Sequence, residues 1–204
     1  MFRSKKKQQQ RGLGDFWSWL AANTERIQSA PGDTTLSGEL SRRFEQCYPG
    51  LTWEITLSDS GPWTFCVSAD GNGELFDRVR AAVADAPPLR GWEVKAFRQR
   101  GSLDAEIEMN GQKLGYGDLW CEVRPEASKA RVKLYVRGLT PESAQLLLGA
   151  ALVLLDNAVG ERDSVEKISD LDNAPLPPNP ARSATFFPLA ELPAYFDRLG
   201  GPVR

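Results

Sequence analysis

Histidine is absent from the 204-residue chain. Its absence excludes Ser-His and Cys-His catalysis, and it excludes zinc, haem and non-haem iron sites that depend on imidazole ligands. An enzyme built on this sequence would have to use carboxylates, lysine, tyrosine, cysteine or a bound cofactor. None of these groups forms a complete catalytic motif, so we expect no catalytic residue, no metal and no cofactor.

Cysteines and long apolar runs are also scarce. Cys47, Cys66 and Cys121 are odd in number and far apart, which favours reduced thiols in a cytoplasm over a disulfide framework. The most apolar run, Ala144 to Leu155, has about a dozen residues, whereas a membrane helix needs roughly 20, so it indicates a buried helix. No apolar stretch of the secretory type follows the basic residues 1–10. We therefore expect a cytoplasmic protein without a membrane segment.

Charge is distributed unevenly along a chain of globular composition. With 41% hydrophobic and 25% charged residues, the chain can form a proper core, and its length suggests one α+β domain over residues 13–204. Residues 1–12 hold five of the 25 basic residues and no acidic one, so the remainder carries 20 basic and 27 acidic groups, a net charge of −7. We expect residues 1–12 to be a disordered basic arm, with contact to nucleic acid or anionic lipid as the alternatives.

Hydrophobic periodicity predicts an α+β fold. Helical spacing predicts helices at 15–27, from Asp33 or Thr34 to about 47, and at 75–83, 141–158 and 189–199. Alternation predicts strands at 51–57, 63–68, 92–98, 105–109, 112–116, 119–123 and 132–136, a short strand around Val165 and Ile168, and a surface loop at 172–183. We expect a mainly antiparallel sheet with helices packed on one face, two N-terminal helices before it, and two degenerate ββαβ units as an alternative description of the strand order.

Several segments carry a resemblance to other sequences. They are Asp15 to Leu20, Ser68 to Gly71, Ala86 to Trp92, Ala96 to Arg98 and Leu155 to Glu161. With these segments, residues 15 to about 198 resemble a group of uncharacterised bacterial cytoplasmic proteins of about this length. The resemblance implies a bacterial cytoplasmic domain, and it implies no activity and no catalytic residue.

Two short motifs match functional sites incompletely. The stretch Asp70 to Glu74 begins like a calcium loop, but Leu75 and Ala81 occupy the positions that need glycine and glutamate. It is better explained as a turn that caps a helix, with an anion at the helix N-terminus as the alternative. Ser164 and Lys167 match the Ser-x-x-Lys spacing of serine acyl-enzymes without the companion motifs, which indicates a chance match.

Acidic residues cluster where helix electrostatics disfavours them. Asp156, Glu161 and Asp163 surround the C-terminus of the predicted helix 141–158, and this end of a helix is electrostatically negative. A buried arginine should compensate, and Arg98 and Arg137 are the candidates. The result would be either a structural ion pair or a polar pocket that binds a ligand.

Tryptophan is abundant, with six residues in the chain. Trp120 is out of phase with Leu119, Cys121 and Val123 on its predicted strand, so it should lie on the opposite, open face of the sheet. An exposed aromatic patch there would mark a binding surface.

These observations support a non-catalytic interaction protein as the first hypothesis. Its partner would be a protein, and the acidic balance favours a basic one, for which toxin neutralisation is one possibility. The alternative is a small-molecule binder or enzyme with a carboxylate and arginine pocket at Asp156, Glu161 and Arg98. A third hypothesis has the basic arm 1–12 bind nucleic acid, whereas the acidic remainder disfavours nucleic-acid binding. The candidate binding residues are thus Asp156, Glu161, Arg98 and Trp120.

Overall fold

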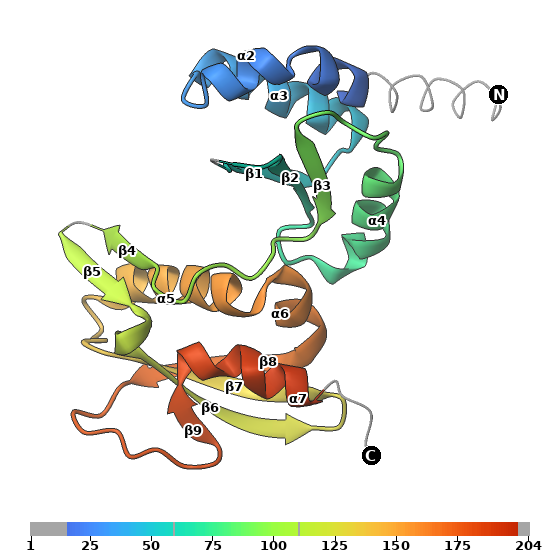
Figure 1. Ribbon diagram of the computed structural model, residues 1–204. Helices are drawn as coiled ribbons and strands as arrows, with labels where there is room; N and C mark the ends of the chain where they lie inside the picture. The colour runs from blue at the N-terminus through green and yellow to red at the C-terminus, as the bar shows by residue number, and fades with distance from the viewer. Residues whose placement is uncertain (1–15, 59, 110, 200–204) are drawn as a thin grey trace. The chain divides into compact units, whose positions relative to one another are not determined.

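The computed structural model describes residues 16–58, 60–109 and 111–199, which contain helices and strands in two compact units (Figure 1). One unit ends at Arg98 and the other begins at Gln99, and each is described by itself. The predicted α+β class is confirmed in both units. The predicted basic arm lies outside the described residues, and the single domain over 13–204 stays a prediction.

The first unit contains a three-stranded sheet preceded by the expected N-terminal helices. Its elements are a helix at 16–22, α2 (Thr24–Ser29), α3 (Thr34–Cys47), β1 (Thr52–Thr56), β2 (Trp63–Ser68), η1 (Gly73–Leu75), α4 (Phe76–Ala84) and β3 (Trp92–Ala96). Asp33 caps α3, because its Oδ1 atom accepts hydrogen bonds from the backbone N–H groups of Thr35 and Leu36. The strand order is β1-β2-β3, with β1 antiparallel and β3 parallel to β2.

Aromatic side chains fill the core of the first unit. The rings of Phe16 and Phe44 pack on Phe65 of β2, with centroids 5.6 and 5.9 Å away. The buried indole N–H of Trp17 donates a hydrogen bond of 2.6 Å to the hydroxyl of Tyr48, so the polar tips of both rings are satisfied. The N-terminal helices therefore cover the face of the sheet on which Phe65 lies.

The second unit contains a hairpin and a four-stranded sheet. Its elements are β4 (Glu106–Met109), β5 (Gln112–Gly115), η2 (Tyr116–Asp118), β6 (Leu119–Glu126), β7 (Lys129–Val136), α5 (Ala144–Val159), α6 (Glu161–Lys167), β8 (Ile168–Pro175), β9 (Phe186–Pro188), η3 (Leu189–Glu191) and α7 (Leu192–Leu199). The strand order is β8-β7-β6-β9, with β6 antiparallel to β7 and β9, and β7 parallel to β8.

Both units contain the same connection pattern. In β1-β2-α4-β3 and in β6-β7-α5-α6-β8, an antiparallel hairpin is followed by a helical crossover to a parallel strand on the far side of the hairpin's second strand. The ββαβ description of the strand order therefore fits both units. The parallel pairs make these two sheets mixed rather than purely antiparallel, and the described strands form three separate sheets.

Two predictions between α5 and β9 are wrong in part, although Ile168 does begin strand β8 and residues 176–183 do lie outside helices and strands. Val165 lies in helix α6, where the pairs Arg162–Glu166 and Asp163–Lys167 have the i,i+4 spacing that stabilises a helix. The predicted loop 172–183 starts too early, because β8 continues to Pro175. Its polar residues stay in the sheet since Asp170 and Asp172 lie opposite Arg131 and Lys133 of β7.

One face of the four-stranded sheet is packed and the other is open. Alternate residues of β6 and β7, such as Cys121 and Leu134, are buried in a core with residues of α5 and α7. The intervening residues point to the opposite face, over which no described helix of this unit packs.

In the described part of the chain no single helix is both long and apolar enough to cross a membrane. Helices α5 and α6 reach that length and composition only together, and the angle between them is 97°.

Candidate functional site

The junction of α5 and α6 collects the acidic residues that the sequence analysis singled out. Gly160 ends α5 with φ of 77°, and its N–H donates a hydrogen bond of 2.7 Å to the carbonyl oxygen of Asp156. Glycine is suited to this position because side chains rarely adopt such a backbone angle. Asp156 is half-buried and Glu161 is fully buried.

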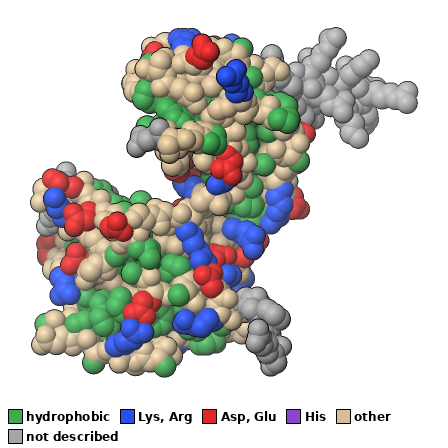
Figure 2. All heavy atoms as spheres, in the orientation of Figure 1, with side chains coloured by type: hydrophobic (Ala, Val, Ile, Leu, Met, Phe, Trp, Pro, Cys, Tyr) green, Lys and Arg blue, Asp and Glu red, His purple; other side chains and the backbone are tan. Residues whose placement is uncertain are grey.

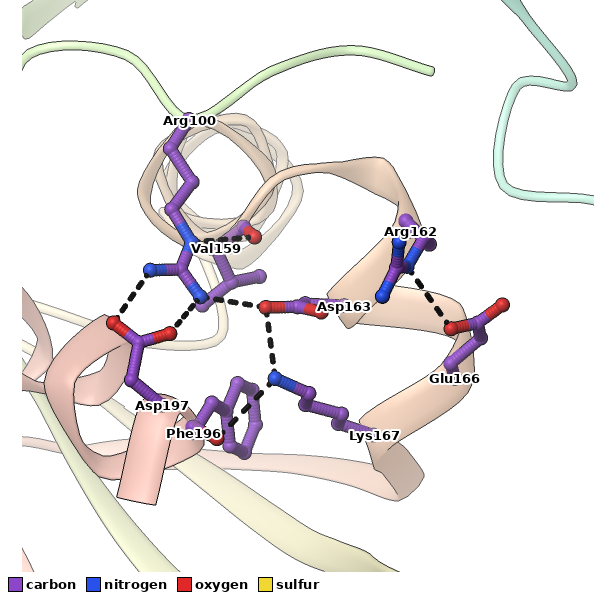
Figure 3. Close-up of polar contacts among 8 residues, drawn as sticks. All are labelled: Arg100, Val159, Arg162, Asp163, Glu166, Lys167, Phe196 and Asp197. Carbon is purple, nitrogen blue, oxygen red and sulfur yellow. Dashed lines mark hydrogen bonds and ion pairs between the residues drawn. The ribbon is translucent and has the colours of Figure 1, made fainter. Parts of the chain in front are cut away.

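Arg100 is a cation that the structure places at this helix end (Figure 3). Its Nε atom donates to the carbonyl oxygen of Val159, in the last turn of α5, at 3.2 Å. Its terminal nitrogens donate to Asp163 at 2.6 Å and to Asp197 at 2.9 and 2.8 Å. Lys167 adds a bond of 3.1 Å to Asp163. A cation at a helix C-terminus offsets both the helix dipole and the acidic side chains.

Arg100 and Asp197 stabilise each other's ionised forms. The guanidinium of Arg100 lowers the pKa of Asp197, and the two carboxylates raise the pKa of Arg100. Lys167 is held by Asp163 and by the carbonyl oxygen of Phe196, 3.2 Å away, so its amine is engaged away from Ser164. The network is therefore a structural clamp, and the Ser-x-x-Lys match gains no support from it.

Arg98 and Arg137, the predicted compensating residues, each form an ion pair with a different acidic residue. Arg98 belongs to the first unit, where it forms an ion pair of 2.6 Å with Asp70. Arg137 pairs with Asp118 at 3.1 Å. An arginine does lie at the helix end, but it is the exposed Arg100 and not a buried one, and sequence spacing could not identify it because it is 59 positions from Val159. A pocket that joins Arg98 to Asp156 and Glu161 stays a prediction.

The other motifs have structural roles. Asn72 caps η1 by accepting a hydrogen bond from the N–H of Glu74, and Gly71 has φ of 79°, so the predicted capping turn is confirmed. Asp104, Glu106 and Glu108, at and before strand β4, are exposed. Among the described residues there is no group of three or more acidic or cysteine side chains that could hold a metal ion.

Trp120 lies on the open face of the four-stranded sheet, as its phase predicts. Its ring and that of Tyr135 each lie 5.0 Å from the ring of Phe186 on β9. The register explains the cluster, because Trp120 is opposite Tyr135 in the β6–β7 pair and β9 adds Phe186 beside them. All three side chains are half-buried, so each keeps part of its surface accessible.

Paired charges continue the open face beyond the aromatic cluster. The hydroxyl of Tyr135 donates a hydrogen bond of 3.0 Å to Glu122, which also accepts two bonds from Arg124. The bonds from Arg124 and Tyr135 lower the pKa of Glu122. Lys133 lies 3.1 Å from Asp172 of β8, and this contact raises the pKa of Lys133.

We call this surface the open face. Its residues are Trp120, Glu122, Arg124, Arg131, Lys133, Tyr135, Asp170, Asp172 and Phe186. The charged ones line a hollow of about 210 Å³. Sequence analysis identified Trp120 alone. The alternation of β7 could have placed Tyr135, whereas Phe186 follows a loop whose return to the sheet has no sequence signal.

Comparison with known proteins adds one partial similarity. No family model and no solved structure matches the chain. A mycothiol acetyltransferase of Stackebrandtia nassauensis is 41% identical over 87 residues, which cover 38% of this chain and 28% of that protein. The chain thus spans less than a third of this curated relative.

Proposed function

We propose that this protein is a non-catalytic binding protein of the bacterial cytoplasm, and that its open face binds a protein partner. The observation that carries the proposal is the aromatic cluster of Trp120, Tyr135 and Phe186 beside paired charges on an uncovered face of the described sheet. Tryptophan, tyrosine and arginine are the residues that contribute most binding energy at protein interfaces.

The paired charges lower the energetic cost of covering this face with a binding partner. The three basic and three acidic side chains of the hollow are balanced, and Glu122, Lys133 and Asp172 already have partners. A partner that covers such pairs leaves fewer charges without compensation than one that covers isolated ions. The net charge of −7 of residues 13–204 adds long-range attraction, which favours a partner with a basic surface.

Capture from the native host with matched baits tests this proposal. The full chain and a Leu152→Ala control, which changes an exposed apolar side chain of α5, should retain the same stoichiometric protein, whereas Trp120→Ala should weaken its binding at least tenfold. The affinity should also fall as salt is raised. Equal retention by Trp120→Ala would refute a role for the open face, and a chain that captures no protein but binds a metabolite would refute the proposed function.

A second candidate is an enzyme or small-molecule binder, and the partial similarity to the acetyltransferase favours it. Acyl transfer from acetyl coenzyme A would require saturable binding of that compound. Calorimetric titration of the full chain with acetyl coenzyme A should then give one-site binding. Absence of binding at millimolar concentration would dismiss acetyl transfer from this donor.

A further inference from the structure

The first unit contains an apolar pocket between its N-terminal helices and the edge of its sheet. The pocket has a volume of about 260 Å³. Ile27, Leu36 and Leu40 line it from the helices, and Trp53, Ile55 and Trp63 line it from β1 and β2. Figure 2 shows hydrophobic side chains at the surface of the first unit in this region. Leu57, another lining residue, is 55% exposed.

The aromatic walls of the pocket are held in place by the core. The ring of Trp53 is stacked on Phe65 at 6.0 Å with an interplanar angle of 16°. Trp63 lies edge-on to Trp92 at 6.0 Å, and the indole N–H of Trp92 donates a hydrogen bond of 2.9 Å to the hydroxyl of Thr24 in α2. These contacts fix the walls before any ligand arrives, which lowers the entropic cost of binding.

One carboxylate gives the pocket its charge. Asp33 is the single charged residue among the described residues that line it. Both backbone N–H groups that Asp33 caps donate to its Oδ1 atom, so neither bond uses Oδ2. A carboxylate oxygen at a largely apolar wall recognises a hydrogen-bond donor, and a cationic donor most strongly.

We propose that this pocket binds a small, ring-containing apolar molecule whose amine points to Asp33. The tryptophan and aliphatic walls would contact the ring, and the Oδ2 atom of Asp33 would accept from the amine. Ligand sites commonly have volumes of about 300–1,000 Å³. The smaller volume of this pocket therefore selects a molecule with one or two rings over a full nucleotide cofactor. The pocket belongs to the first unit and the open face to the second, and the inference does not depend on the proposed protein partner.

Binding of a simple probe to the full chain tests the inference. Tryptamine should bind saturably by calorimetry and by saturation-transfer NMR, and indole-3-propionate, which has a similar ring and the opposite charge, should bind at least fivefold more weakly. Asp33→Asn should remove this preference without unfolding α3, because asparagine caps helices about as well as aspartate.

A pair of helix variants separates the pocket from non-specific binding. Ser37→Phe places a ring at the lining of the pocket and should abolish tryptamine binding, whereas Ser41→Phe, at an exposed position of α3 outside the lining, should leave it unchanged. Equal binding by the Ser37→Phe variant, or an unchanged preference for tryptamine in Asp33→Asn, would overturn the inference. Failure of both indole probes to bind at millimolar concentration would also overturn it.

Discussion

Replacing Gly101 by alanine should destabilise the second unit by about 1–2 kcal/mol. A Cβ atom at this position would overlap Oδ1 of Asn157 and lie 2.9 Å from its Cγ. Asn157 is not free to move aside, because its Nδ2 atom donates to the carbonyl oxygen of Ser102 at 2.9 Å and to the hydroxyl of Tyr116 at 2.8 Å. That hydroxyl in turn donates to the carbonyl oxygen of Leu154 at 2.9 Å.

The magnitude follows from these contacts. Displacing the amide of Asn157 loses two hydrogen bonds, each with a net value of about 1 kcal/mol. The smaller conformational freedom of alanine in the unfolded chain offsets about 0.4–1 kcal/mol of this loss. The remainder is the expected decrease in the free energy of unfolding, which urea denaturation followed by circular dichroism measures.

Two controls make the measurement decisive. Gly149→Ala, in α5, adds a Cβ with nothing within 4 Å, so it should stabilise the protein by about 0.5–1 kcal/mol. In an Asn157→Ala background, Gly101→Ala should cost much less, because the obstructing amide is gone. If Gly101→Ala is as stable as Gly149→Ala, or costs the same in both backgrounds, then the contact of residue 101 with Asn157 is not the cause.

Three further predictions concern the clamp and one hairpin. Arg100→Ala should lower the free energy of unfolding by about 1–3 kcal/mol, because it removes hydrogen bonds to two carboxylates. The control Arg162→Ala removes one exposed i,i+4 pair and should lower it by about 0.5 kcal/mol or less. Chemical denaturation of the two variants measures both changes. Arg100 lowers the pKa of Asp197 in the folded protein. The resulting stabilisation is present above the ordinary aspartate pKa of about 3.9 and is lost as pH falls through the lower folded value. Between pH 6 and 3 the free energy of unfolding should therefore fall more steeply with decreasing pH for the natural chain than for Arg100→Met. Ala127→Gly should stabilise the protein by about 1 kcal/mol, because Ala127 has φ of 49° in the β6–β7 turn; an unchanged thermal midpoint would contradict this.

Local patterns were sufficient for most elements of the fold. Alternation located β6 and β7, and it placed Trp120 on the face opposite Cys121, because side chains of a strand alternate between two environments. Capping chemistry limited the start of α3 to Asp33 or Thr34, and the structure shows that Asp33 is the cap. These features depend on neighbours within a few positions, which a single sequence displays.

Features that depend on distant partners could not be predicted. The polar strand β8 has no alternation of its own and is stabilised by charged partners on β7. Arg100 reaches Asp197 across 97 positions, and no spacing rule connects them. The pocket in the first unit was missed for the same reason, since Leu36 and Trp53 belong to separate amphipathic patterns that each indicated only core packing.

Each ββαβ portion is continuous in sequence, and this affects how the chain folds during its synthesis. Every strand of the first sheet precedes Arg98, and its most distant pairs, such as Trp63 with Trp92, are 29 positions apart in sequence. Translation at about 5–20 residues per second leaves roughly 5–20 s between the synthesis of Arg98 and that of Arg204. Hairpins form in about 1–10 μs, so the first sheet has time to close while the strands of the second are still being synthesised. Two segments with the same connection pattern thus emerge from the ribosome one after the other, which limits exchange of strands between them.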